Sequence, residues 1–436
     1  MPDNHLIFPD GFLWGTGTSS HQIEGGNDNN DWWDWERVPG HIRDGNASGL
    51  ACDHYHRYCE DWALARAMGQ NAHRLSIEWS RVEPQEGEWN AEALAHYRSV
   101  LEAMRDHSLE PMVTLHHFTN PRWLVAKGGW ENPAVVLHFT RYAARVVGEL
   151  GDLCRLWVTI NEPMVCFYEG YLTRRWPPGS GGFFRGLHSV RHMIQAHART
   201  YRLIHKAQGS SEVGIAHNMR LFDPADPRRL LDRMVGAGED YLFNRIVLWA
   251  LLDGYQRIPL GRGQYLAEAD DSLDFIGLNY YARDMVSFAL RGATTLVSRN
   301  FASPGAETDL FGWEVYPEGL YRLLKQLSVF GKPIYVTENG LADRTDEKRP
   351  RYLVESVAAM WRALSEGAPV RGYFHWTLMD NFEWAEGYSV PFGLVAVNRE
   401  TQERTIKTSG QVYSKICRAN GVPAALAASY IPSEQG

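Results

Sequence analysis

The chain has 436 residues, of which 44% are apolar and 22% charged, and these proportions exclude wholesale disorder. Its 52 acidic and 44 basic residues give a net charge of -8, which argues against a nucleic-acid partner or an anionic membrane surface. There are 16 Trp residues, and Trp and Tyr together outnumber Phe by 36 to 17; this surplus suits aromatic cores and sugar-binding surfaces equally well.

The cysteines and the N-terminus bear on the cellular compartment. Five Cys residues, an odd number without CxxC spacing, predict reduced and mostly buried thiols. Met1–Gly11 lacks the basic and apolar regions of a signal peptide. Apolar runs such as Ile246–Leu252 are too short to span a bilayer. We therefore expect a cytoplasmic protein with no membrane partner.

Eight short β-rich runs recur along the chain. In order they are Phe12–Ser20, Ala72–Trp79, Pro111–Phe118, Leu156–Glu162, Val213–Asn218, Phe275–Tyr281, Pro333–Glu338 and Val370–Met379. Their nearly continuous apolar character is typical of parallel strands that are buried on both faces.

Segments between these runs carry apolar residues at helical spacing. The pattern predicts helices over Asp53–Gly69, Asn90–His107 and Asn132–Leu150. Asn90 is the expected N-cap of the second helix, and Pro133 the expected first residue of the third.

This alternation predicts an α/β fold, a single (β/α)8 barrel domain over residues 1–436. The length would also allow about three domains, but barrels of this class often reach it as one unit. The alternative is an open, doubly wound sheet. That fold normally has a Gly-rich nucleotide-binding loop after an early strand, and the sequence has none.

In an α/β barrel the functional site lies at the carboxyl ends of the strands. Two of the predicted strands end in a glutamate beside an amide side chain, namely Asn161-Glu162 and Glu338-Asn339. A single such Glu is usually a solvated loop residue or a helix cap, but two in one barrel point to a carboxylate pair. The other ends add Gln22, Glu24, Arg74, His116, His117, Asn279, Tyr281 and Trp376.

Several of these residues have a structural interpretation as well. Arg74, if buried, needs a carboxylate partner, which could be purely structural or a catalytic Glu. Adjacent strand residues point to opposite faces, so at most one of His116 and His117 enters the barrel mouth, which argues against a two-histidine metal site. His54 and His56 fit packing or helix capping. Three further aromatics are expected in the core: Trp14, Trp79 and Trp157.

Taken together, four motifs resemble those of glycoside hydrolase family 1, the family of β-glucosidases. Phe12–Gly25 is similar to its N-terminal signature, Thr159–Pro163 to its acid/base motif, and Pro333–Gly340 to its nucleophile motif. Asp380–Tyr388, followed by Phe392-Gly393, is similar to its sugar-pocket motif. The match runs over nearly the whole chain and in the family's order.

The resemblance implies a retaining mechanism that uses no cofactor and no metal. Glu162 would be the acid/base, and Glu338 the nucleophile that forms a covalent glycosyl-enzyme. Arg74, Asn279 and Tyr281 would support Glu338, and the charge of Arg74 with the Tyr281 hydroxyl would lower the pKa of that carboxyl. The charge of Glu338 would in turn raise the pKa of Glu162.

The same resemblance implies a pocket for the non-reducing sugar of small β-glucosides or short β-linked oligosaccharides. Trp376 would form the platform under the ring, and Trp313 would line the aglycone side. Thioglucosidase relatives lack the acid glutamate that Glu162 supplies, and Glu383 would repel a phosphorylated sugar. The remaining implied sugar-binding residues are Gln22, His117, Asn161, Glu383, Trp384 and Phe392.

Two positions depart from the family pattern. Phe118 stands where the family commonly has Trp, so one pocket wall lacks an indole N–H, and Gly17 replaces a usual Ala. β-Galactosidase or β-fucosidase activity is the alternative within the same chemistry. A non-catalytic sugar-binding barrel and a metal-dependent barrel hydrolase are the alternatives from other classes.

Overall fold

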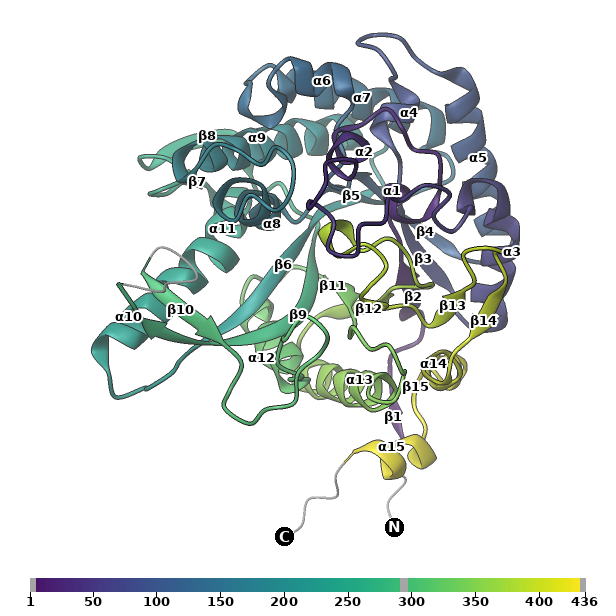
Figure 1. The fold of residues 1–436 in the computed structure, drawn as a ribbon, viewed down its shortest axis with the longest axis vertical. Helices are drawn as coiled ribbons and strands as arrows, with labels where there is room; N and C mark the ends of the chain where they lie inside the picture. The colour runs from purple at the N-terminus through teal and green to yellow at the C-terminus, as the bar shows by residue number, and fades with distance from the viewer. Residues whose placement is uncertain (1–4, 291–296, 432–436) are drawn as a thin grey trace.

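A closed barrel of eight parallel strands forms the centre of the computed structural model, which describes residues 5–290 and 297–431 (Figure 1). Its strands are β2 (Leu13–Gly17), β3 (Ala72–Ser76), β4 (Glu110–His116), β5 (Leu156–Asn161), β6 (Glu212–Pro224), β9 (Phe275–Phe288), β11 (Ile334–Asn339) and β12 (Val370–Trp376). Each strand pairs with the next, and β12 pairs with β2, which closes the ring. The barrel prediction is therefore confirmed, and the open-sheet alternative is wrong.

Side chains from every strand fill the interior of the barrel. The cluster comprises Leu13, Ala72, Met112, Leu156, Val158, Ala216, Phe275, Tyr335 and Phe374. Because side chains fill the interior, a ligand site is expected at the strand ends. A larger apolar cluster packs the outer face of the barrel against the helices, and Trp14, Trp79 and Trp157 belong to it, as expected.

The main helices lie around the barrel (Figure 1). They are α3 (His54–Ala67), α5 (Ala91–Asp106), α7 (Val135–Leu150), α9 (Phe183–Ala207), α11 (Ile246–Asp253), α12 (Glu318–Ser328), α13 (Arg349–Ser365) and α14 (Thr408–Ala419). The Asn90 side chain caps α5 by accepting from the backbone N–H groups of Glu92 and Ala93. Pro133 is not the first residue of α7, because a turn closed by the Asn132 carbonyl and the Val135 N–H precedes the helix.

Short helices follow the carboxyl ends of successive strands and build the loops above the barrel. They are α1 (Ser20–Ile23), α2 (Asp31–Trp35), α4 (Trp79–Val82), α6 (Arg122–Ala126), η1 (Gly129–Glu131), α8 (Pro163–Phe167), η2 (Tyr168–Leu172) and η4 (Trp384–Glu386).

Strands β6 and β9 continue past the barrel as a projecting arm (Figure 1). Their parallel pairing extends to Pro224 and Val286, and β10 (Ser298–Phe301) pairs antiparallel with the end of β9. Helix α10 (Leu230–Glu239) packs against the arm, and η3 (Asp240–Arg245) links it to α11. A small hairpin, β7 (Gly254–Gln256) with β8 (Gln264–Asp270), packs against α11.

The two ends of the described chain meet beneath the barrel. Strand β1 (Leu6–Ile7) pairs antiparallel with β15 (Gly421–Val422), and α15 (Ala424–Tyr430) follows. Within residues 5–290 and 297–431, no helix has both the length and the apolar character needed to cross a membrane.

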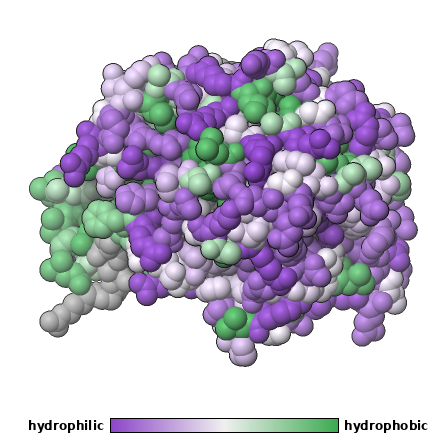
Figure 2. All heavy atoms as spheres, turned by 90° about the horizontal axis from the view of Figure 1, so that it is seen from above, coloured by the Kyte–Doolittle hydropathy of each residue, from purple (hydrophilic) through white to green (hydrophobic). Residues whose placement is uncertain are grey.

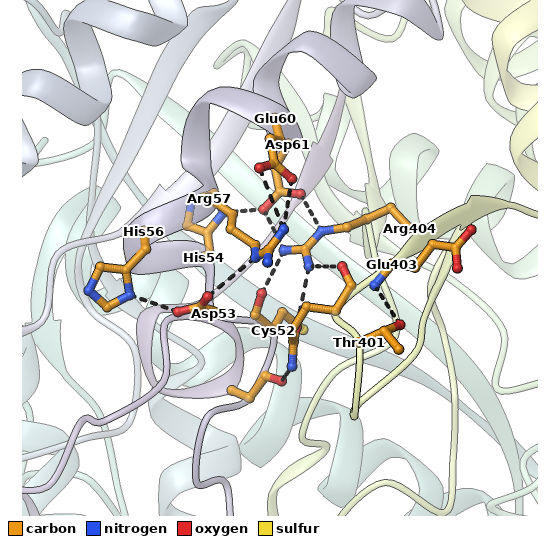
Figure 3. Close-up of polar contacts among 12 residues, drawn as sticks. Cys52, Asp53, His54, His56, Arg57, Glu60, Asp61, Thr401, Glu403 and Arg404 are labelled. Atoms are coloured by element: carbon orange, nitrogen blue, oxygen red, sulfur yellow. Dashed lines mark hydrogen bonds and ion pairs between the residues drawn. The ribbon is translucent and has the colours of Figure 1, made fainter.

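A second hairpin, β13 (Val395–Val397) with β14 (Arg404–Ile406), is held to α3 by a buried ion pair (Figure 3). The Arg404 guanidinium donates to both carboxylate oxygens of Asp61, at 2.9 and 3.2 Å, and to the Cys52 carbonyl at 2.6 Å. His54 contacts the same carboxylate at 2.8 Å. Burial opposes ionisation of Asp61, but His54 and Arg404 outweigh it and lower the pKa of the carboxyl.

Candidate active site

A cavity of about 710 Å³ lies at the carboxyl ends of the barrel strands. Nine of the thirteen residues expected in the site line it, namely His117, Glu162, Tyr281, Trp313, Glu338, Trp376, Glu383, Trp384 and Phe392. The other four, Gln22, Arg74, Asn161 and Asn279, are buried and hydrogen-bonded to lining residues. The strand ends and the segments that follow them thus bring all thirteen to one site.

Glu338, near the end of β11, is held between a cation and a phenol. The Arg74 guanidinium donates to Glu338 Oε1 at 2.5 Å, and the Tyr281 hydroxyl donates to Oε2 at 2.6 Å. Arg74 is buried within the barrel mouth, and its other N–H groups reach Asn161 Oδ1, Thr114 and the Thr337 carbonyl. Both carboxylate oxygens therefore have donors that fix the orientation of the carboxylate.

Glu162 follows β5 and occupies a different environment. Its Oε1 atom accepts from the Asn279 amide at 2.7 Å and from the Asn218 amide at 3.0 Å. Burial, followed by the charge of Glu338, raises the pKa of Glu162 to about 8, against the smaller lowering effect of the two amides. Glu162 is therefore mostly protonated at neutral pH.

Asn279, predicted to support Glu338, lies beside it in the strand register, but its amide donates to Glu162 and Asn161 instead. The Thr337 hydroxyl donates to Asn279 Oδ1 at 2.6 Å and so turns the amide nitrogen toward β5. Asn279 thus orients Glu162, while Arg74 and Tyr281 hold Glu338.

The wall nearest the carboxylates is built around a neutral histidine. Burial, and then the charge of Arg74, lowers the pKa of His117 well below its usual value. Its ring lies nearly parallel to those of Trp376 and Trp384, with centroids 5.7 and 6.0 Å away, and its Nε2 atom contacts Asn161 at 3.3 Å. His116 faces away from the cavity and contacts Trp130 and Asn120, as the strand alternation predicts.

Glu383 is a second carboxyl group of the cavity wall with a raised pKa. Burial raises the pKa of Glu383 to about 8; the charge of Glu338 also raises it, whereas a hydrogen bond from Trp376 lowers it. The Gln22 amide donates to Glu383 Oε2 at 3.2 Å and to the Phe382 carbonyl at 2.9 Å. This side of the cavity therefore offers both donors and acceptors to a polyhydroxylated ligand.

Three non-glycine residues of the cavity have left-handed backbone conformations. The φ angles are 74° at Phe118, 49° at Glu162 and 48° at Trp384. Such conformations are strained for these residue types and concentrate at functional sites. The Phe118 ring packs edge-to-face against Trp384 and Trp176, with interplanar angles of 76° and 60°, so this wall is aromatic even though it lacks an indole N–H at position 118.

The opposite wall is also aromatic. Trp313 stacks on Phe311 with centroids 4.3 Å apart, and Tyr281 lies between this pair and Phe392. The Arg220 guanidinium lies 5.3 Å from the Trp313 ring centre. The expected aglycone residue Trp313 thus lies beside Tyr281, a partner of Glu338.

Asn218 and the apolar far end of the cavity were not predicted from the sequence. Asn218 closes the predicted run Val213–Asn218, so the strand-end rule applied to that run would have found it. The far end comes from the arm and from η2, which no motif marked. Within residues 5–290 and 297–431, no group of three or more His, Cys, Asp or Glu side chains could hold a metal ion.

Comparison with known proteins decides the family. The model of glycosyl hydrolase family 1 matches residues 4–422. The chain belongs to this family. A beta-glucosidase A of Thermotoga maritima is 33% identical to this family 1 chain over 442 residues, covering 95% of this chain and 98% of that protein. A beta-galactosidase of Pyrococcus woesei is 32% identical, covering 95% and 98%.

A solved structure supports the same family assignment. A beta-glycosidase from Pyrococcus horikoshii matches with a TM-score of 0.92 and 37% identity, covering 99% of each chain. The family 1 chain is therefore a glycoside hydrolase, and the cavity at its strand ends is the place to look for the reaction.

Proposed function

We propose that this enzyme hydrolyses terminal β-glucosides with retention of configuration, using Glu338 as nucleophile and Glu162 as acid/base. The observation that carries the proposal is that two buried carboxyl groups face one cavity in opposite electrostatic settings. A charged Arg74 pairs with Glu338, while Glu162 has only neutral donors and a raised pKa. Pairs of carboxyl groups that differ in this way perform acid and nucleophile roles in glycosidases.

In the first step Glu338 attacks the anomeric carbon and Glu162 donates its proton to the leaving oxygen. The glycosyl ester that forms removes the negative charge of Glu338. Because that charge contributes to the raised pKa of Glu162, the pKa then falls, and Glu162 can accept a proton from the incoming water. One pair of residues thus serves both steps.

The sugar is held by the polar wall next to the carboxyl pair. Asn161, held by Arg74 and Asn279, is the candidate for the 2-hydroxyl. Glu383 and His117 are candidates for the other ring hydroxyls, with Trp376 against the ring face. A glucoside preference follows the Thermotoga maritima relative, and the Pyrococcus woesei relative makes galactosides the second candidate.

A mechanism-based label tests the assignment. Incubation with 2,4-dinitrophenyl 2-deoxy-2-fluoro-β-glucoside should inactivate the enzyme and add one fluoroglucosyl group to the peptide that contains Glu338. The reason is that the fluorine slows hydrolysis of the glycosyl-enzyme more than its formation. Mass spectrometry of a digest locates the label. A label on another residue, or release of the α-anomer of glucose as the first product by NMR, would overturn the proposal. A tenfold higher kcat/KM for nitrophenyl galactoside than for the glucoside would reverse the sugar ranking alone.

A further inference from the structure

The start of helix α1 carries a serine whose hydroxyl does not cap the helix. Ser19 precedes α1 and has the extended backbone of an N-cap residue. In the part of the chain that the structure describes, its side chain accepts no hydrogen bond from the helix N–H groups, as an N-cap serine usually does. The Ser19 hydroxyl instead donates to Gln22 Oε1 at 2.6 Å. Its side chain therefore orients a neighbouring amide rather than the helix.

The contacts of the Gln22 amide define which way it faces. Its nitrogen donates to the Phe382 carbonyl at 2.9 Å, and to Glu383 Oε2 and Asn381 Oδ1 at 3.2 Å each. A carbonyl oxygen can only accept, so the amide nitrogen must face Phe382 and the amide oxygen must face Ser19. Within residues 5–290 and 297–431, Ser19 is the sole hydrogen-bond donor to that oxygen.

Both side chains lie inside the protein. Figure 2 shows a mainly hydrophilic surface, with apolar side chains gathered at the end that carries α10 and β10. Ser19 and Gln22 lie beneath the protein surface and are 1% and 0% exposed. Bulk water therefore has no access to Gln22 Oε1, and a lost Ser19 hydroxyl would leave this oxygen without a partner.

Gln22 holds the segment that forms one side of the sugar pocket. Besides the side-chain contacts, its backbone carbonyl accepts from the Phe382 N–H at 3.4 Å. Glu383 and Trp384 follow directly and line the cavity, and Trp384 has a strained, left-handed backbone that needs support from its neighbours. Gln22 is enclosed and does not line the cavity, so it acts on a ligand through this segment.

We propose that Ser19 is a positioning residue for sugar recognition, because its hydroxyl fixes the Gln22 amide in the orientation that holds the Glu383 carboxyl toward a ring hydroxyl of the substrate. Ser19 touches neither the substrate nor the cavity, and its effect passes through Gln22. The inference rests on the proposed glucosidase function and adds a residue to its sugar-binding wall.

Replacing Ser19 by Ala tests the proposal with a small change. Without the hydroxyl the amide loses its preferred orientation, and we expect kcat/KM for nitrophenyl β-glucoside to fall about tenfold. Ser20→Ala is the matched control and should change kcat/KM less than about twofold. Ser20 is also buried at the start of α1, but its hydroxyl donates to Glu78 rather than to Gln22. Equal losses in the two variants would overturn the inference.

Deoxy sugars distinguish positioning from a general structural role. A weakened fold lowers kcat/KM for every substrate alike, because it reduces the amount of active enzyme. Acting through Glu383, Ser19→Ala should instead cost less than about twofold on the one deoxy glucoside that lacks the hydroxyl bound by Glu383. The same substrate should be least affected by Glu383→Gln. An equal loss on the 3-, 4- and 6-deoxy nitrophenyl glucosides would overturn the inference.

A double variant tests the route through Gln22. When Gln22 is already replaced by Ala, the Ser19 hydroxyl has no amide to orient, so adding Ser19→Ala should change kcat/KM less than about twofold. A loss of about tenfold in both backgrounds would show that Ser19 acts by another route and would overturn the inference.

The two proposals fail in different ways. If the unaltered enzyme does not hydrolyse nitrophenyl glucoside, the proposed function is wrong and the role of Ser19 falls with it. If it does, and Ser19→Ala behaves like Ser20→Ala, the glucosidase function stands and the role of Ser19 is wrong.

Discussion

The protonation of Glu162 should set the alkaline limit of activity. An acid with a pKa of about 8 loses its proton as the pH rises through that value, so kcat/KM for an alkyl glucoside should fall about tenfold per pH unit above 8. Glu162→Gln should lose this alkaline limb of the pH profile. Its activity is assayed with dinitrophenyl glucoside, whose leaving group needs no acid. Because the pKa of Glu383 is also raised to about 8, Glu383→Gln is the control and should keep the limb.

The amides that donate to Glu162 predict the direction in which this alkaline limit shifts when one of them is removed. Asn218 donates to Glu162 Oε1 and lowers its pKa, so Asn218→Ala should move the alkaline limb upward by up to about one pH unit. A pH profile of kcat/KM measures the shift. An unmoved or downward-shifted limb would show that Glu162 does not control it.

Among the elements outside the barrel, the β13–β14 hairpin depends on one buried ion pair. The Arg404 and Asp61 side chains are 7% and 0% exposed, so Arg404→Ala leaves a buried carboxylate without its cation. We expect the free energy of unfolding to fall by about 3–5 kcal/mol at pH 7, measured by urea denaturation. Below about pH 4 the loss should shrink, since Asp61 has a lowered pKa and its stabilisation disappears as acid protonates it.

Arg57→Ala is the matched control in the same cluster (Figure 3). Arg57 pairs with Asp53 and Glu60 but is 34% exposed, so its loss should cost less than about 1 kcal/mol. Equal losses in the two variants would contradict the view that burial makes the Arg404 pair important.

The sequence predicted the barrel elements because burial on both faces leaves a strong trace. Strands enclosed by the barrel core and the helices have apolar sequences, and each of the eight predicted runs overlaps a barrel strand. Capping by Asn90 was also predictable, since the signal is local. The start of α7 was not predictable from Pro133, because a turn closed by the Asn132 carbonyl precedes the helix.

The arm escaped the same argument for a physical reason. Past Asn218 and Tyr281 the strands β6 and β9 alternate between buried and partly exposed residues. Each apolar run therefore ends at these residues, although the strand continues. The site residues at strand ends were predictable from position, whereas Trp313, Glu383, Trp384 and Phe392 were predicted from the family resemblance. The direction of the Asn279 amide and the apolar far wall were not, since each depends on contacts between segments distant in the chain.

For the molecule as a whole, one asparagine joins the two ends of the chain beneath the barrel. Asn420 donates to the Phe8 carbonyl at 2.8 Å and accepts from the Trp14 indole at 2.9 Å. Its φ angle of 48° is a left-handed conformation that Asn and Gly tolerate better than Ala. Phe8, Phe12 and Trp14 pack in mutual contact above it, with ring centroids 4.7–4.9 Å apart.

Replacing Asn420 should therefore weaken the entire barrel. We expect Asn420→Ala to lower the free energy of unfolding by about 2–4 kcal/mol, since it loses the side-chain hydrogen bonds to Phe8, Pro9 and Trp14 and adds backbone strain. Asn420→Gly loses the hydrogen bonds alone and should cost about 1–2 kcal/mol. Because β12 closes the ring on β2, tryptophan fluorescence and activity should be lost at the same urea concentration in both variants. Fluorescence loss at a lower urea concentration than activity loss would show instead that the ends unfold independently of the active site.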